Sequence, residues 1–92
     1  MTVRVRFLAQ LKTLFGAREK DVELAGPASL EGLLNALCDT PERRKEIFLP
    51  DNTLNPQVIV MKGGTNVLSL QGLATPLADG DAVAVLPFIV GG

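Results

Sequence analysis

Apolar and polar side chains alternate along residues 3–8, as they do in a strand that buries one face. The predicted inward residues are Val3, Val5 and Phe7. The opposite face carries two arginines and then Leu8, an apolar residue where water is expected. The same alternation returns over residues 20–24, so we expect these two segments to pair as a hairpin.

Two further strands are predicted in the second half of the chain. Residues 58–61 are apolar on both faces, which favours a central place in the sheet. After a turn of two glycines, residues 67–70 are expected to pair back. Residues 83–86 alternate again and place Leu86 on the water-facing side. Pro87 is expected to end the pairing there or to confine it to an edge.

Helical spacing appears between these strands. Residues 30–38 carry apolar side chains on one helical face, and Ser29 before them is a suitable N-cap. Thr40 followed by a proline repeats the start signal and predicts a short helix over residues 41–48. Residues 10–15 are expected to form a helical turn. The order of the predicted strands and helices indicates an α+β fold, a mixed sheet with one main helix packed on one face.

Composition indicates one folded domain. The chain has 92 residues, 47% of them hydrophobic, and a net charge of -1, which is unlike a disordered segment. The basic cluster at residues 43–45 is bracketed by Glu42 and Glu46, so no nucleic-acid partner is expected. A single cysteine, no leader-like start and no long apolar run favour a cytoplasmic protein without a membrane partner.

The chain carries few groups suited to catalysis. It has no His, Tyr or Trp, and therefore lacks the commonest general base and metal ligand. Cys38 lies on the apolar helix face, where a core role is favoured over that of a nucleophile. Asp79 and Asp81 flank Gly80 and indicate a tight turn rather than a calcium loop. We expect no metal, no cofactor and no catalysis by this chain alone.

The sequence closes on two glycines, Gly91 and Gly92. A segment without Cβ atoms can be threaded through a narrow channel of a partner, so this tail, residues 87–92, is expected to be a substrate. If the strands that hold Leu8 and Leu86 are neighbours, these side chains and Phe88 form one apolar patch at the root of the tail. Such a patch usually marks a protein interface. The alternative is that they are scattered surface residues, which are common.

These residues resemble a known family. The segment from Leu77 through Pro87 into Val90-Gly91-Gly92, together with a first strand that ends Phe7-Leu8-Ala9-Gln10, is similar to the small subunits of molybdopterin synthase, called MoaD. MoaD belongs to the ubiquitin-like β-grasp sulfur carriers, with the thiamine-pathway carrier ThiS as a cousin. The resemblance implies one β-grasp domain over residues 1–92. This chain has Phe88 where the family usually has a second proline.

The resemblance also implies a mechanism and partners. An E1-like enzyme would use ATP to adenylate the Gly92 carboxylate, and sulfur transfer would then give a thiocarboxylate. A large synthase subunit similar to MoaE would accept the tail and supply the basic residues that the pterin precursor needs. The resemblance places Leu8 and Leu86 at interface positions. The carrier would contribute a reactive atom while its partners position the reactants.

Three other functions remain open at this point. An adenylated diglycine can also be attacked by an amine, which would make the chain a protein modifier joined to target lysines. A ThiS-type carrier for thiazole synthesis is the second alternative, although the chain is long for that group. The third is a β-grasp interaction module with an accidental glycine end.

Overall fold

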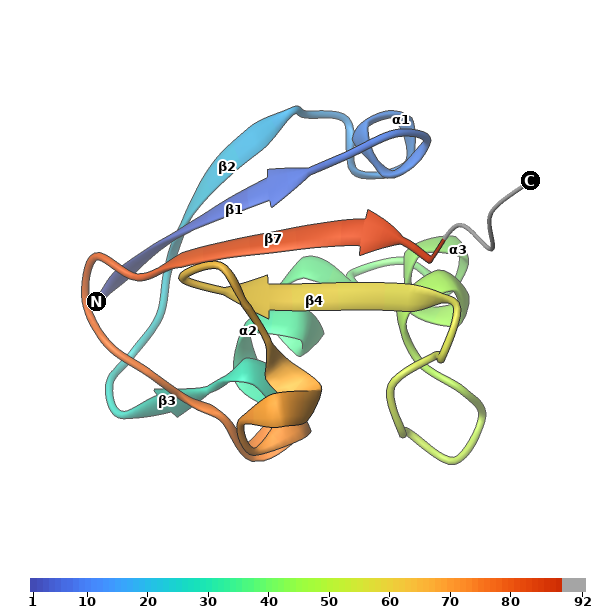
Figure 1. Ribbon diagram of the computed structural model, residues 1–92. Helices are drawn as coiled ribbons and strands as arrows, with labels where there is room; N and C mark the ends of the chain where they lie inside the picture. The colour runs from blue at the N-terminus through green and yellow to red at the C-terminus, as the bar shows by residue number, and fades with distance from the viewer. Residues whose placement is uncertain (89–92) are drawn as a thin grey trace.

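The structure, a computed structural model, describes residues 1–88. Its strands are β1 (Thr2–Phe7), β2 (Glu19–Glu23), β3 (Ala28–Ser29), β4 (Val58–Lys62), β5 (Thr65–Asn66), β6 (Pro76–Leu77) and β7 (Ala82–Pro87). Its helices are α1 (Leu11–Phe15), α2 (Leu30–Leu37) and α3 (Pro41–Ile47), with 3₁₀ turns η1 (Val67–Ser69) and η2 (Gly72–Ala74). In Figure 1, α2 lies behind the sheet and α1 follows the end of β1.

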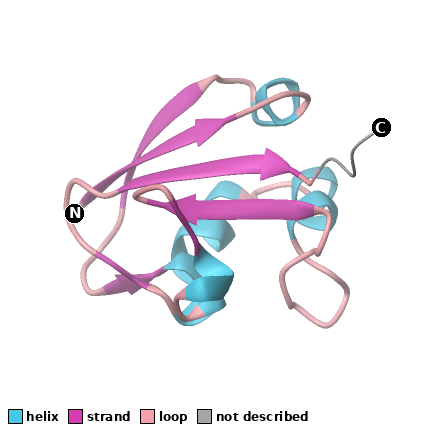
Figure 2. Ribbon diagram, in the orientation of Figure 1, coloured by secondary structure: helices cyan, strands magenta, loops and turns pink. Residues whose placement is uncertain are grey.

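Within residues 1–88, five strands form one sheet in the order β2-β1-β7-β4-β5, and β3 pairs with β6 separately. The predicted hairpin of β1 and β2 is confirmed as an antiparallel pair. The pair β1 and β7 is parallel, and the pair β4 and β7 is antiparallel. The last strand of the described chain is therefore the middle strand of the sheet, as Figure 2 shows.

The core lies between the inner face of the sheet and α2. Strands β1 and β7 turn alternate residues inward, and the alternation predicted for β1 is confirmed by the burial of Val3, Val5 and Phe7. The predicted apolar face of α2 contributes Leu30, Leu33, Leu34 and Leu37. The ring of Phe7 stacks on that of Phe15 with 4.5 Å between centroids, which fixes α1 against the end of β1. Helix α1 ends at Gly16, whose φ of 71° is the left-handed conformation that glycine adopts without strain.

Strand β4 lies inside the sheet between β7 and β5, but its second face is not buried as its sequence predicted. It pairs with β7 along its length, whereas β5 pairs only with Met61 and Lys62. Val58 and Val60 are buried against the core, but Ile59 and Met61 stay half-buried on the outer face. The apolar residues on its second face therefore form a surface, not a second core layer.

Residues 67–70 were also predicted wrongly, because η1 occupies residues 67–69 and the strand pairing involves Thr65 and Asn66 instead. The side chain of Asn66 accepts a hydrogen bond from the Leu68 amide at 3.0 Å, which favours the turn over an extended strand. Pro87 is the last residue of β7, as expected, but β7 is not an edge strand. Strand β1 has already ended beside it, so the missing proline amide breaks no ladder there.

The two predicted helix caps differ. The Thr40 side chain accepts a hydrogen bond from the Arg43 amide at 3.2 Å, which confirms it as the N-cap of α3. Ser29 occupies the N-cap position of α2 but makes no side-chain capping bond. The Leu30 amide instead donates to the Thr75 carbonyl at 2.9 Å, since Ser29 belongs to β3 and lies beside β6.

Candidate functional site

Parallel pairing of β1 and β7 brings Leu8 next to Leu86. The register aligns Phe7 with Val85, so the residues that follow each of them are neighbours. The Leu8 amide donates to the Val85 carbonyl at 3.1 Å and continues the ladder one residue beyond β1. Leu8 is 38% exposed, and Leu86 is half-buried. The neighbouring strands that the sequence analysis required are therefore present.

Phe88 extends this surface where the chain leaves the sheet. Its amide donates to the Gln57 carbonyl at 2.8 Å, which holds the residue beside the start of β4. Phe88 is 52% exposed, a large apolar area for a residue so well anchored by its backbone. The three apolar residues singled out in the sequence thus lie at one end of β1 and β7. Their role in binding a partner stays a prediction.

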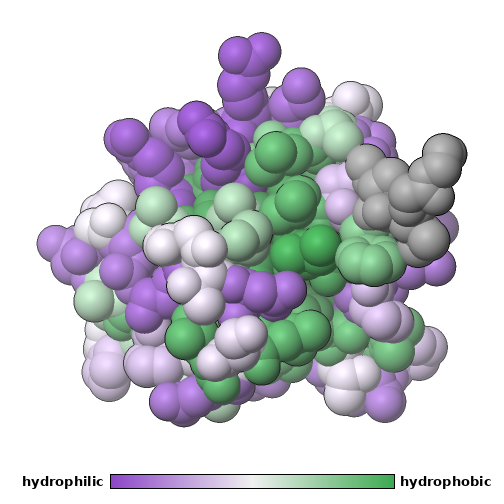
Figure 3. Space-filling model, in the orientation of Figure 1, coloured by the Kyte–Doolittle hydropathy of each residue, from purple (hydrophilic) through white to green (hydrophobic). Residues whose placement is uncertain are grey.

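The outer face of the sheet continues the apolar surface toward β4. Ala84 and Leu86 of β7 lie opposite Met61 and Ile59 of β4 in the antiparallel register. All four side chains are partly exposed. Figure 3 shows this face in the orientation in which α2 lies behind the sheet, with apolar side chains over β7 and β4 and polar ones over β1 and β2. We call Leu8, Ile59, Leu86 and Phe88 the tail-root surface.

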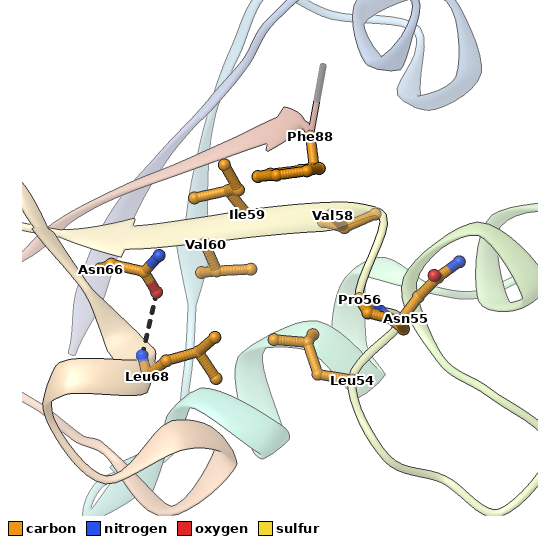
Figure 4. A pocket seen from close by; sticks show the side chains of 9 residues that line it. All are labelled: Leu54, Asn55, Pro56, Val58, Ile59, Val60, Asn66, Leu68 and Phe88. Atoms are coloured by element: carbon orange, nitrogen blue, oxygen red, sulfur yellow. Dashed lines mark hydrogen bonds between the residues drawn. The ribbon is translucent and has the colours of Figure 1, made fainter. Parts of the chain in front are cut away.

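A groove of about 290 Å³ adjoins the tail-root surface at β4. In Figure 4, Ile59 and Phe88 lie on one side of β4, and Leu54 and Leu68 lie on the other. Leu68 is 73% exposed. Ile59, Leu54 and Leu68 were not predicted from the sequence as part of the patch. The only signal was the apolar second face of residues 58–61, which was interpreted as core.

The predicted reacting residues Gly91 and Gly92 lie outside the described residues. The structure places the described chain up to Phe88, and the residues before it are fixed by the sheet. Strand β7 has a partner on each side, β1 and β4, so the described chain ends just after the middle strand of the sheet.

The remaining titratable candidates have structural surroundings. Burial raises the pKa of the Cys38 thiol to about 11, and its Sγ lies 3.8 Å from the Arg43 carbonyl. The carboxylate of Asp79 accepts the Thr2 amide at 2.7 Å, and that of Asp81 accepts the Ala78 amide at 2.8 Å. Asp81 also lies 3.5 Å from the ammonium group of Lys62. Both carboxylates therefore fasten the turn before β7, as the tight-turn interpretation requires.

Residues 1–88 offer neither a metal site nor a membrane-spanning helix. No three His, Cys, Asp or Glu side chains are grouped so that they could hold a metal ion. No helix in the same range is both long and apolar enough to cross a bilayer.

The sequence matches a family model over most of its length. The model describes the ThiS family and covers residues 5–92. Small archaeal modifier protein 3 of Haloferax volcanii is 32% identical over 92 residues, all of both chains. A putative sulfur carrier protein of Archaeoglobus fulgidus is 30% identical, again over all of both chains.

Solved structures agree with these sequence matches. The solution structure of small archaeal modifier protein 1 from Methanosarcina acetivorans has a TM-score of 0.85 and 26% identity, covering 99% of this chain and 96% of that one. A putative molybdopterin converting factor, subunit 1, from Pyrococcus furiosus has a TM-score of 0.74 and 26% identity. The match covers 97% of this chain and 99% of that one. The fold is a ubiquitin-like β-grasp, as the sequence resemblance implied.

Proposed function

Because the chain belongs to the ThiS family of ubiquitin-like sulfur carriers and modifiers, we propose that it carries sulfur on its C-terminal residue, Gly92. The observation that carries the proposal is the position of the diglycine, four residues after Pro87 ends the middle strand of the sheet. Glycines contribute no side chain to a core, so their value there is access for another protein. The tail-root surface lies beside that point and offers such a protein a place to dock.

The chemistry runs in two steps. An E1-like enzyme joins the Gly92 carboxylate to the AMP part of ATP and releases pyrophosphate. A sulfur donor then attacks the carbonyl carbon, AMP leaves with the bonding electrons, and a thiocarboxylate remains. The carboxylate alone is a poor electrophile. The mixed anhydride is a good one, because AMP is a good leaving group. This chain supplies the reacting atom and an unobstructed approach to it, and the partner enzymes supply positioning and charge stabilisation.

We further propose molybdopterin synthesis as the pathway. The likeness to the Pyrococcus protein named as a molybdopterin converting factor supports this branch, together with the resemblance of residues 77–92 to MoaD. The thiocarboxylate would then donate sulfur to the pterin precursor in a large subunit similar to MoaE. In that complex Leu8, Leu86 and Phe88 pack against the large subunit, and the tail enters its pocket.

The test is a reconstitution followed by intact-mass measurement. The full chain is incubated with the E1-like enzyme of the same organism, ATP and sulfide, and we expect the mass gain that corresponds to oxygen replaced by sulfur. A chain lacking Gly92 serves as the control and should keep its circular dichroism spectrum and unfolding midpoint while gaining no mass. If the shortened chain is still loaded, or if the full chain never is, the proposal is wrong.

A second candidate function is that of a protein modifier. It is favoured by the name of the Haloferax relative, a small archaeal modifier protein that is 32% identical over the whole chain. In this case a lysine amine of a target attacks the adenylate, AMP leaves, and an isopeptide bond forms at Gly92. Incubation with cell extract separates the two functions, because a modifier produces covalent adducts on target proteins. A dedicated carrier instead donates its sulfur to the pterin precursor or, for a ThiS-type carrier, to thiazole synthesis.

A further inference from the structure

The charges of this chain are strongly separated, although their total is only -1. Residues 1–20 hold five of the nine Lys and Arg residues and one of the ten Asp and Glu residues. The rest of the chain has the opposite balance. Because β1, α1 and the start of β2 come from this first segment, one part of the surface is cationic on an otherwise acidic molecule.

Three of these cations gather around one hollow. The hollow has a volume of about 250 Å³ and is lined by Arg6, Phe7, Leu8, Ala9, Lys12 and Arg18, a set without a carboxylate. The backbone builds it, because the Phe7 amide donates to the Arg18 carbonyl at 2.9 Å and the Lys12 amide donates to the Ala9 carbonyl at 3.2 Å. The turn through α1 therefore returns Arg18 to the end of β1.

The charges of this hollow are weakly neutralised by the protein itself. Among residues 1–88, neither Lys12 nor Arg18 has a carboxylate within 4.0 Å, and Arg6 reaches Glu19 only at 4.0 Å with its side chain 65% exposed. Arg4 on the same strand is different. Its guanidinium lies 3.1 Å from Asp21 and 3.3 Å from Glu19, and the hydrogen bond to Asp21 raises its pKa. Arg4 is therefore paired with carboxylates of its own domain, whereas the three cations of the hollow remain available to a partner.

The hollow and the tail-root surface share Leu8. This side chain lines the hollow and also lies beside Leu86, so the cations border the apolar surface on the side of β1. Protein interfaces commonly combine an apolar centre with a charged rim, and the rim sets the rate and orientation of encounter more than the affinity. Figure 3 shows polar side chains adjoining the apolar area on this side.

We propose that Arg6, Lys12 and Arg18 form a cationic rim that steers the tail-root surface onto an acidic surface of the adenylating enzyme. This inference rests on the proposed function. A carrier must reach its enzyme quickly, be loaded and leave again. Exposed charge pairs suit that cycle, because they raise the association rate while adding little to the stability of the complex.

The test measures association of the full chain with the E1-like enzyme of the same organism by stopped flow, at low and at high ionic strength. Reversing all three charges, as Arg6→Glu, Lys12→Glu and Arg18→Glu, should lower the association rate constant at low salt by at least about tenfold. It should also flatten its dependence on salt, since screening acts on the same interaction. Arg6→Lys with Arg18→Lys keeps the charges and should stay within about twofold of the original rate.

A matched pair of variants separates the effect of where a charge lies from the effect of net charge. Lys12→Glu and Lys45→Glu change the net charge equally, and Lys45 on α3 does not line the hollow. Only Lys12→Glu should slow association. If the full chain is loaded with sulfur but the reversed variants associate at the original rate with the original salt dependence, the rim is refuted while the proposed function stands.

Two other results would also overturn the inference. If the original chain is never adenylated, the proposed function fails first and the rim, which depends on it, fails with it. If the rim binds an RNA oligonucleotide, and charge reversal abolishes that binding without changing association with the enzyme, the rim serves a nucleic acid instead. Folding of every variant is checked by its unfolding midpoint.

Discussion

The amide of Leu8 donates to the carbonyl of Val85 across 3.1 Å and joins the end of β1 to the strand that leads into the tail. This bond has two consequences. It places the Leu8 side chain beside Leu86, and it ties α1, which begins at Leu11, to the root of the tail. Leu8 belongs to both the apolar surface and the cationic hollow, and this bond, which continues the parallel pairing of β1 and β7, is what makes the two adjacent.

A charged residue within the tail-root surface should weaken docking without unfolding the domain. For Leu86→Asp we expect the dissociation constant for the adenylating enzyme to rise by at least about tenfold, which is about 1.4 kcal/mol, because a desolvated carboxylate has no partner in an apolar contact. Titration calorimetry measures the change. Leu70→Asp is the control, since Leu70 is 45% exposed and lies outside this surface. Equal affinities for the two variants would show that the surface is incidental.

Two phenylalanines of the chain should respond very differently to truncation. Phe7 is 1% exposed and stacked on Phe15, so Phe7→Ala should lower the free energy of unfolding by about 3–5 kcal/mol. Phe88 is 52% exposed, and Phe88→Ala should change the free energy of unfolding by no more than about 0.5 kcal/mol. Urea unfolding followed by circular dichroism gives both values. A large loss for Phe88→Ala would mean that this ring serves the fold and not a partner.

The two helix caps give a second matched pair. Thr40→Ala removes the acceptor of the Arg43 amide and should cost about 1 kcal/mol of unfolding free energy. Ser29→Ala should cost a few tenths of that, roughly 0.3 kcal/mol, because its side chain caps nothing and the Thr75 carbonyl already accepts the Leu30 amide. Thermal unfolding of both variants checks the order, and a larger loss for Ser29→Ala would contradict it.

Cys38 should behave as an inert core thiol. Burial raises its pKa from 9.0 to about 11, so at pH 8 the folded protein holds about 100-fold less thiolate than the unfolded chain. Alkylation by iodoacetamide should be slower by at least that factor, and urea should abolish the difference. The thiol loses its proton at a higher pH in the folded state than in the unfolded chain. The free energy of unfolding therefore falls as the pH rises from about 9 to 11, and Cys38 has no such effect at lower pH. Fast labelling of the folded protein would contradict this prediction and favour Cys38 as a nucleophile.

Sequence alone determined the main strands and helices, although not the turn at residues 67–70. Alternation in residues 3–8 and 83–86 fixed which side chains face the core, because the side-chain period of a strand is set by backbone geometry. The spacing in residues 30–38 did the same for α2. The absence of histidine and the terminal diglycine required no fold to be recognised.

Only the tertiary structure decided which strands are neighbours. Strand register depends on hydrogen bonds between segments far apart in the chain, and no local pattern encodes the partner. For this reason the middle position went to β7 and not to β4, and the apolar second face of β4 became surface. Likewise, Arg6, Lys12 and Arg18 are unremarkable along the sequence. They form one cationic hollow because the turn through α1 hydrogen-bonds Arg18 back to Phe7.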